Sequence, residues 1–235
     1  KQLKNFNMEK RVILLIGHKG LIGKYLHHFF LKKKHTKVLL VDKKDNLDLT
    51  DRNSVKTYLK KNKDINYIVN ASGKNDHVIK SVKKDPYEDD ETLMEYINDN
   101  VVGPKNIIEL SSSLCKNLKS IIHFSSLYGK KSPYHPIYKK KKSLSYCISK
   151  HAMEGLTKYY STLLAPRKIR INNIRVGGVE NNQPENFVKN FLKKTPANQM
   201  VQKKDLANAV DFMCSEKSQY IFGENICLDG GYNLW

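Results

Sequence analysis

The sequence predicts an α/β protein, a doubly wound and mostly parallel sheet with helices on both faces. Short runs rich in apolar and β-branched residues alternate with longer stretches of helical periodicity along the chain. A glycine-rich turn joins the first such run to the first helical stretch, as expected where a parallel strand leads into a crossover helix. The chain has 235 residues and no evident linker or internal repeat, so one domain over residues 1–235 is expected.

The first elements follow from this alternation. Residues 11–16 form an apolar run with β-branched members, and a helical pattern then extends to about Lys34. Residues 37–41 form the second predicted strand. Asp51 is placed to cap a helix that continues to about Lys61.

The middle of the chain continues the pattern. Residues 66–70 predict a third strand, and residues 87–115 predict a long helix with a break near Gly103 and Pro104. Residues 120–124 then predict the fourth strand. In a parallel sheet the loops that follow the strands lie at one edge, where ligands bind.

The last third predicts a helix over residues 145–164 and strands over residues 169–176 and 225–228. Two shorter helices are expected between these strands, over residues 185–194 and 203–214. Right-handed crossovers between parallel strands then place helices on both faces of the sheet.

The composition excludes several classes of protein. With 40% hydrophobic residues the chain is not wholly disordered, and its best apolar run, residues 12–16, is too short to span a membrane. No secretory leader is recognisable. The formal charge of +19 invites a nucleic-acid hypothesis, but the lysines are spread along the chain without a recognition motif. We therefore expect an anionic small molecule as partner, and no specific nucleic acid and no membrane.

The four cysteines, Cys115, Cys147, Cys214 and Cys227, contain no C-x-x-C pair. This spacing argues against a metal site and against a disulfide scaffold. Reduced thiols and a cytoplasmic location are the expectation.

The glycine turn has the spacing of a phosphate-binding loop. Gly17, Gly20 and Gly23 form G-x-x-G-x-x-G between the first predicted strand and its helix. Glycines let the backbone approach a pyrophosphate, and the helix offers free N–H groups and the positive end of its dipole. The second strand ends at Asp42, where an acid accepts hydrogen bonds from ribose hydroxyls and repels a 2′-phosphate. NAD is therefore favoured, while Lys43 and Lys44 leave NADP possible.

Tyr146 and Lys150 lie four residues apart on a predicted helix and share one face. A tyrosine phenol has an unperturbed pKa of about 10, and a nearby ammonium group favours the phenolate. The pair therefore suits acid–base chemistry near neutral pH.

Taken together, these motifs resemble the short-chain dehydrogenase/reductase family over nearly the whole chain. The resemblance rests on the glycine turn, Asn70-Ala71-Ser72-Gly73, Asn100, Ser125-Ser126, Tyr146-Cys147-Ile148-Ser149-Lys150, Arg170-Ile171-Asn172-Asn173-Ile174 and Leu228-Asp229-Gly230-Gly231-Tyr232. It implies a Rossmann-type fold and an NAD(P)-dependent oxidoreductase that transfers a hydride between nicotinamide and a carbonyl or secondary alcohol.

The resemblance also implies roles for single residues. Tyr146 is similar to the proton donor, Lys150 to the group that lowers its pKa and binds ribose, Ser126 to the partner of the substrate oxygen, and Asn100 to a proton-relay residue. The implied cofactor contacts are Gly17, Lys19, Gly20, Leu21, Ile22, Gly23, Asp42, Asp48, Leu49, Asn70, Ala71, Ser72, Gly73, Tyr146, Lys150, Gly177 and Val179.

Some features depart from the family pattern. The segment between Ser126 and Tyr146 is longer than usual, and residues 130–143, with a lysine run at 139–142, would overhang the active site. Val176 replaces the usual proline before Gly177. Phe187 and Phe191 are spaced either to face the pocket from a lid helix or to pack on the core from a plain amphipathic helix.

The insertion and the segment after Gly178 resemble the branch associated with bacterial flagellin modification and surface-sugar biosynthesis, which implies a sugar-derived substrate. A non-catalytic dinucleotide-binding regulator and a sugar epimerase or dehydratase stay open as alternatives. The resemblance further implies a homodimer or homotetramer through the two long helices, with Leu234-Trp235 as a further contact.

Overall fold

A computed structural model describes residues 10–45, 47–75, 87–138 and 141–234. Six strands form one sheet in the order β2-β1-β3-β4-β5-β6, and all five pairings are parallel. The strands are β1 (Arg11–Ile16), β2 (Thr36–Val41), β3 (Tyr67–Asn70), β4 (Ser120–Ser126), β5 (Arg170–Val176) and β6 (Asn225–Leu228). The expected α/β fold with a parallel sheet is confirmed.

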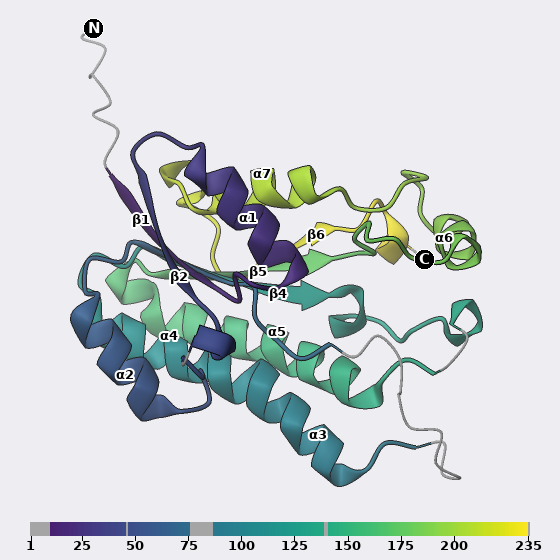
Figure 1. Ribbon diagram of the computed structural model, residues 1–235, viewed down its shortest axis with the longest axis horizontal. Helices are drawn as coiled ribbons and strands as arrows, with labels where there is room; N and C mark the ends of the chain where they lie inside the picture. Colours follow the sequence, from purple (N-terminus) through teal and green to yellow (C-terminus); the bar gives the residue numbers. More distant parts are fainter. Residues whose placement is uncertain (1–9, 46, 76–86, 139–140, 235) are drawn as a thin grey trace, which may run out of the picture.

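Helices cover both faces of this sheet (Figure 1). One face carries α1 and α7, and the other carries α2, α4 and α5. Their bounds, with those of α3 and α6, are α1 (Leu21–Leu31), α2 (Arg52–Lys61), α3 (Asp90–Ile97), α4 (Gly103–Leu114), α5 (Leu144–Leu164), α6 (Glu185–Leu192) and α7 (Lys203–Met213). Alternate residues of each central strand enter the two apolar layers, as Leu14 and Leu15 do in β1.

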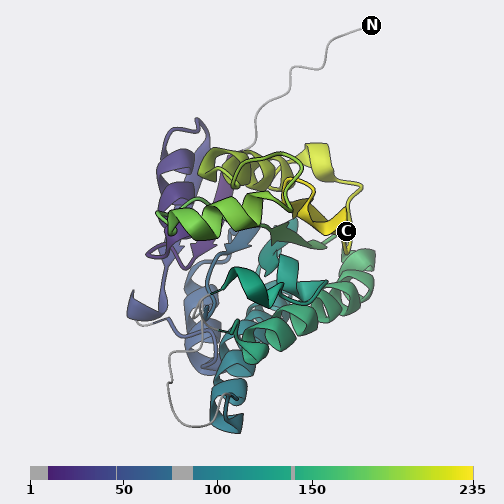
Figure 2. The same ribbon diagram turned by 90° about the vertical axis from the view of Figure 1, so that its right-hand side faces the viewer.

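The strand order has a switch point between β1 and β3. From β1 the chain adds β2 on one side and then β3 on the other, so the loops after β1 and β3 diverge at their carboxyl ends. Figure 2 looks onto this edge, where α6 and the segment after β4 lie in front of the sheet. The fold therefore gathers the predicted loops at one edge.

The structure corrects the prediction of one long helix over residues 87–115. Regular α-helix begins at Asp90, where Asp89 accepts a hydrogen bond from the N–H of Thr92 and caps it. The irregularity is a π-helical turn, η2 (Asn98–Val102), and it precedes the expected break at Gly103. Pro104, the second residue of α4, directly follows this turn.

Other predicted boundaries shift by a few residues. Asp51 caps α2 as expected, accepting from the N–H groups of Asn53 and Ser54. β4 extends two residues past the expected end, to Ser126, because it pairs with β5 along its whole length. The helix expected to reach Lys34 ends at Leu31. Among the described residues, no helix is both long and apolar enough to cross a membrane.

Candidate functional site

The glycine turn after β1 requires glycine for two physical reasons. Gly17 has φ of +79°, and a Cβ there would lie 2.6 Å from the backbone nitrogen of Ser72. A Cβ on Gly23 would lie 2.1 Å from the carbonyl oxygen of Gly17. The turn thus packs backbone against backbone and keeps the β1 and β3 loops in contact.

Gly20 is the N-cap of α1, with no side-chain cap and no acid in the first turn. The first N–H groups of an α-helix have no intrahelical partner and carry the positive end of its dipole. This helix start is therefore suited to a phosphate group.

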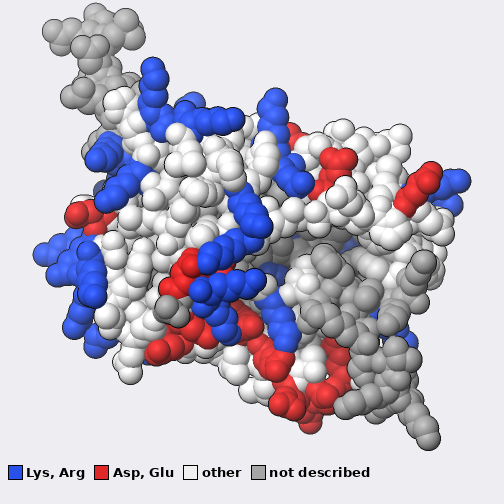
Figure 3. Space-filling view, viewed as in Figure 1, with Lys and Arg blue, Asp and Glu red and all other residues white. Residues whose placement is uncertain are grey.

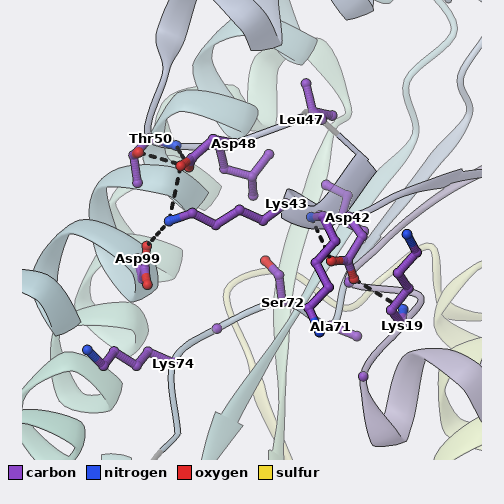
Figure 4. Close-up of a pocket in the computed structure, with 16 residues that line it drawn as sticks. Lys19, Asp42, Lys43, Leu47, Asp48, Thr50, Ala71, Ser72, Lys74 and Asp99 are labelled. Atoms are coloured by element: carbon purple, nitrogen blue, oxygen red, sulfur yellow. Dashed lines mark hydrogen bonds and ion pairs between the residues drawn. The ribbon is translucent and has the colours of Figure 1, made fainter.

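A pocket of about 500 Å³ opens beside this turn, between the carboxyl ends of β1, β2 and β3 (Figure 4). Nine predicted contact residues line it: Gly17, Lys19, Gly20, Asp42, Asp48, Leu49, Ala71, Ser72 and Gly73. On the face shown in Figure 3, Lys and Arg side chains lie among Asp and Glu rather than in one continuous positive patch.

The pocket also has lining residues that the motifs did not assign to it. They are Ile16, Leu47, Thr50, Lys74 and Asp99, together with Lys43 and Lys44, whose charges had been noted. Lys74 directly follows Gly73, and Asp99 directly precedes Asn100. For Lys74 and Asp99, this position next to a motif residue is the only signal in the sequence that could have identified them.

Several predicted contacts lie outside this pocket. Leu21, Ile22 and Gly23 belong to α1, and the side-chain oxygen of Asn70 accepts from the N–H and the hydroxyl of Ser72, at 3.1 and 2.6 Å. Asn70 therefore shapes the loop rather than lining the pocket.

Asp42 is held by backbone donors. Its Oδ2 accepts from the N–H of Lys19 and its Oδ1 from the N–H of Lys44, both at 3.1 Å. The carboxylate thus lies between the glycine turn and the start of the loop after β2 (Figure 4).

Asp48 accepts hydrogen bonds from the N–H and hydroxyl of Thr50 and forms an ion pair with Lys43 at 3.0 Å. Burial alone would raise the pKa of Asp48, but these bonds outweigh it, so the pKa of Asp48 is lowered. The carboxylate is therefore ionised at neutral pH.

Ser126, Tyr146 and Lys150 come together at the end of β4 and on α5. The Ser126 hydroxyl forms a hydrogen bond with the Tyr146 side chain. The Lys150 ammonium lies 5.6 Å from the centroid of the Tyr146 ring and donates to the carbonyl of Phe124 at 2.8 Å. Tyr146 and Lys150 are each 7% exposed.

Burial dominates the acid–base properties of this group. It raises the pKa of Tyr146 to about 12, and the bond with Ser126 opposes part of that increase. Burial, and then the Lys142 ammonium, lower the pKa of Lys150 to about 8. At neutral pH the phenol is protonated and the ammonium group is mostly charged.

Asn100 connects the two parts of the site. Its Oδ1 accepts from the N–H of Lys74 at 2.7 Å, and its Nδ2 donates to the carbonyl of Lys74 at 3.0 Å and to Ser149 Oγ at 2.9 Å. A Cβ on Gly73 would lie 2.8 Å from Asn100 Oδ1 and 3.8 Å from Lys150 Nζ. The amide thus fixes the β3 loop beside the lysine.

His123 lies under this group on β4 and is fully buried. Its Nδ1 accepts from the Asn70 amide at 3.3 Å, while its Nε2 has no hydrogen-bond partner among the described residues. Burial, reinforced by Lys150, lowers the pKa of His123 to about 3, so the ring stays neutral. The motif reasoning did not identify this side chain.

The insertion before α5 closes the front of the site. The hydroxyl groups of Tyr138 and Tyr128 are in contact. The centroid of the Tyr138 ring lies 5.4 Å from that of Phe187 of α6. Phe191 stacks on Tyr232 at 4.6 Å, within the apolar cluster that contains Tyr146. Phe187 and Phe191 thus pack in the apolar cluster that contains Tyr146.

The insertion also brings a second cation to the tyrosine. Lys142 is 6% exposed, and its ammonium lies 4.4 Å from the Tyr146 ring centroid and donates to Asn75 at 3.1 Å. Lys139 and Lys140 of the expected lysine run lie outside the described residues, as does Trp235 of the expected C-terminal contact.

Gly177 and Val179 follow β5 on the far side of the site. The N–H of Gly177 donates to the carbonyl of Leu228 at 2.8 Å, and Val179 forms a parallel bridge with Val201 through its neighbours' backbone groups. The N–H of Val179 is not used in that bridge.

The donor set fits a dinucleotide. The uncapped start of α1 and the tight glycines suit a pyrophosphate, and Asp42 and Asp48 suit hydroxyl and amine donors. Lys150 lies beyond Gly73, on the side of the pocket where a second nucleoside would reach the tyrosine. Among the described residues, no group of three or more His, Cys, Asp or Glu side chains could hold a metal ion.

Comparison with known proteins agrees with this geometry. A family model described as enoyl-(acyl carrier protein) reductase matches residues 32–233. A 3-oxoacyl-(acyl-carrier-protein) reductase of Thermotoga maritima is 25% identical over 254 aligned residues, covering 95% of this chain and 98% of that protein. A post-translational flagellin modification protein A of Campylobacter coli is 26% identical over 118 residues, covering 49% of this chain and 46% of that protein.

Among solved structures, a short-chain dehydrogenase from Leptospira borgpetersenii with bound NAD+ is 26% identical, with a TM-score of 0.82. The match covers 99% of this chain and 97% of that one. The likeness therefore extends over both the pocket and the tyrosine region.

Proposed function

The chain belongs to the short-chain dehydrogenase/reductase family and is an NAD(P)-dependent oxidoreductase; we propose that Ser126, Tyr146 and Lys150 are its catalytic residues. The observation that carries this proposal is the meeting of three side chains. A serine hydroxyl bonds the phenol, and a buried ammonium lies one helical turn further, next to the β3 loop. Asn100 is proposed as a positioning residue.

The nicotinamide cofactor, when bound, supplies or accepts the hydride. The hydroxyl groups of Ser126 and Tyr146 lie next to each other, so both can donate to the oxygen of a carbonyl substrate. These bonds stabilise negative charge that develops on that oxygen. Because the pKa of Tyr146 is about 12, the phenol carries the proton that the oxygen requires.

Lys150 has two tasks in this proposal. Its positive charge stabilises the phenolate that remains after proton transfer, and its place beside Gly73 suits a ribose hydroxyl. Asn100 holds Gly73 and Lys74 in position for that contact. The N–H of Val179 and the loop at Gly177 are proposed to meet the carboxamide.

For the cofactor we favour NAD over NADP. Both oxygens of Asp42 are fixed by backbone N–H groups at the end of β2, where they can accept from ribose hydroxyls. The proposed contact set remains that named from the sequence, with Asp48 at the adenine.

For the substrate we propose a sugar-derived metabolite of surface-glycan or flagellin-modification biosynthesis. Support comes from the Campylobacter coli relative and from the insertion, whose Tyr138 ring lies against the Phe187 ring of α6. Aromatic faces with hydroxyl groups suit a ligand that has both apolar C–H faces and polar edges.

A 3-oxoacyl thioester is the second candidate, because the Thermotoga maritima reductase matches nearly the whole chain. A screen of sugar phosphates and nucleotide sugars against acetoacetyl thioesters and steroid ketones separates the two. The measured signal is the absorbance of reduced nicotinamide. Turnover of a sugar supports the proposal, and turnover of thioesters or steroids alone contradicts the sugar assignment.

The same screen tests the remaining alternatives. An epimerase leaves its cofactor unchanged after each cycle, and a regulator without chemistry shows cofactor binding but no turnover of any compound. Net reduction or oxidation of the cofactor with one substrate contradicts both.

One domain and a homodimer or homotetramer are part of the proposal. One sheet runs through the chain, and large apolar side chains are exposed on the long helices, among them Met94, Ile148, Tyr159 and Leu163. Leu234 is also exposed. Sedimentation of the purified protein tests the assembly, and the cytoplasmic location stays a prediction.

A further inference from the structure

Two of the pocket's lysines are paired with carboxylates. The Lys19 ammonium contacts Asp45, which also bonds His18 Nε2 at 2.8 Å. The Lys43 ammonium lies 3.0 Å from Asp48 Oδ2 and 3.3 Å from Asp99 Oδ1 (Figure 4). Both cations therefore have nearby countercharges before any ligand binds.

The backbone donors of this region are occupied as well. The N–H groups of Lys19 and Lys44 both donate to Asp42. NADP differs from NAD by a phosphate on the adenosine 2′-oxygen, and such a group needs N–H donors and unpaired cations. In the described pocket the ammonium groups of Lys19 and Lys43 and the N–H groups of Lys19 and Lys44 are already bound to acids, whereas Lys44 contributes a further cation.

We propose that Asp45 and Asp99 determine cofactor specificity in this chain by holding Lys19 and Lys43 away from a 2′-phosphate. This inference rests on the proposed function, in which the pocket receives the adenosine half of the cofactor. Asp42 then excludes the phosphate directly, and the other two acids withhold two of the pocket's cations, Lys19 and Lys43, that could compensate for it.

The two acids reach the pocket from different places. Asp45 ends the 3-10 turn η1 (Lys43–Asp45) directly after β2, whereas Asp99 lies in the π-helical turn between α3 and α4. Lys43 extends across the pocket from one segment to the other (Figure 4). The hydrogen bond to Asp48, together with Asp99, raises the pKa of Lys43, as expected for an engaged ammonium group.

The expected effects are modest and unequal. All these side chains are partly exposed, and exposed ion pairs contribute little individually. Asp45 is the carboxylate that contacts the Lys19 ammonium, whereas Lys43 keeps Asp48 when Asp99 is neutralised. Asp45→Asn should therefore release its lysine more completely than Asp99→Asn.

The test measures the dissociation constants of NAD+ and NADP+ by calorimetry and compares their ratio between variants. We expect the ratio of the NADP+ constant to the NAD+ constant to fall about fivefold in Asp45→Asn and about twofold in Asp99→Asn. Adding Lys19→Gln to the first variant, or Lys43→Gln to the second, should return the ratio to the wild-type value. This reversal identifies the freed ammonium as the cause.

Asp64→Asn is the matched control, because it removes one negative charge from an exposed position before β3, at the opposite edge of the sheet. If it changes the ratio as much as Asp45→Asn does, net charge explains the effect and the inference is wrong. It is also wrong if both pocket variants leave the ratio unchanged, or if the added lysine substitutions fail to reverse it. If the wild-type protein binds neither dinucleotide, the proposed function fails, and this inference with it.

Discussion

The pocket beside β2 and the cluster around Tyr146 lie at the same edge of the sheet but are built from different side chains. The pocket is open and lined by charged residues, with Lys43 and Asp99 among them. The cluster around Tyr146 is closed by aromatic rings, and its single lysine from α5 is 7% exposed. Charge pairs between exposed groups therefore control the first region, and desolvation controls the second.

This difference teaches where each kind of substitution should act. In the pocket, charge changes should alter which ligand binds and by how much. In the cluster, changes should alter proton transfer and the pH dependence of stability, because a buried group has few ways to compensate for a lost partner.

The largest expected effect is on catalysis. Tyr146→Phe removes the phenolic hydroxyl, which Ser126 bonds in the structure, and leaves the ring in its apolar cluster. Loss of a general acid should lower kcat about a thousandfold, while calorimetry finds cofactor affinity nearly unchanged. Tyr159→Phe, exposed on the same helix, is the control. Activity of Tyr146→Phe within a few fold of wild type would remove the distinction between the two regions.

The next effect is on ligand binding. Gly17→Ala places a Cβ 2.6 Å from Ser72 N at a φ of +79°, so the loops after β1 and β3 must separate. Cofactor affinity, measured by calorimetry, should fall by about tenfold or more. Gly155→Ala is a control, because nothing lies within 4 Å of a Cβ there. Wild-type affinity in Gly17→Ala would show that the turn does not approach the ligand.

His123 provides a stability test of the buried region. Its pKa is about 3 in the folded protein, against about 6.5 when unfolded, so the unfolded chain binds the extra proton as pH falls. This one group should lower the free energy of unfolding by about 2 kcal/mol between pH 7 and pH 5. Denaturant titrations at pH 7 and pH 5 measure this loss. In His123→Asn, the loss in the free energy of unfolding between the two pH values should be about 2 kcal/mol smaller than in the wild-type protein. Equal losses in both proteins would mean that the ring titrates normally.

The smallest expected effect concerns the insertion. Lys142→Gln removes a cation that, after burial, lowers the pKa of Lys150, which is about 8. That pKa should rise, and the corresponding limb of the kcat/KM profile should move to higher pH by less than about one unit. The titratable groups that face it are Tyr146 and Lys150, with Cys147 and Glu88. Lys141→Gln, an exposed neighbour, should leave the profile unchanged, and an equal shift in both variants would argue for a general charge effect.

The regions also differ in how far the sequence predicts them. The glycine turn, Asp42 and the Tyr146–Lys150 spacing depend on local geometry, and the structure brings each of them to the edge expected for a parallel sheet. The roles assigned to these residues stay predictions that the variants above address. Local spacing was sufficient because a strand, a turn and a helix face are each defined within a few residues.

The features of the site that the sequence did not predict depend on contacts between distant segments. Lys43 meets Asp99 across 56 positions, and the pKa of His123 is lowered because the surrounding structure buries the ring beside Lys150. The π-helical turn at Asn98 has no signature in the periodicity, which predicted a break at Gly103 instead. Burial of Lys142 against a ring likewise follows from the path of the insertion, which composition does not define.

The wide turn of five residues from Asn98 to Val102 has a consequence for sequence variation in this region. Each residue of an α-helix turns the chain by about 100°, so deleting one position here would restore ordinary winding and rotate everything on one side by that angle. The amide of Asn100 would then leave the backbone of Lys74, and the carboxylate of Asp99 would swing off the ligand-facing surface. Substitutions within this turn are therefore easier to accommodate than any change in its length.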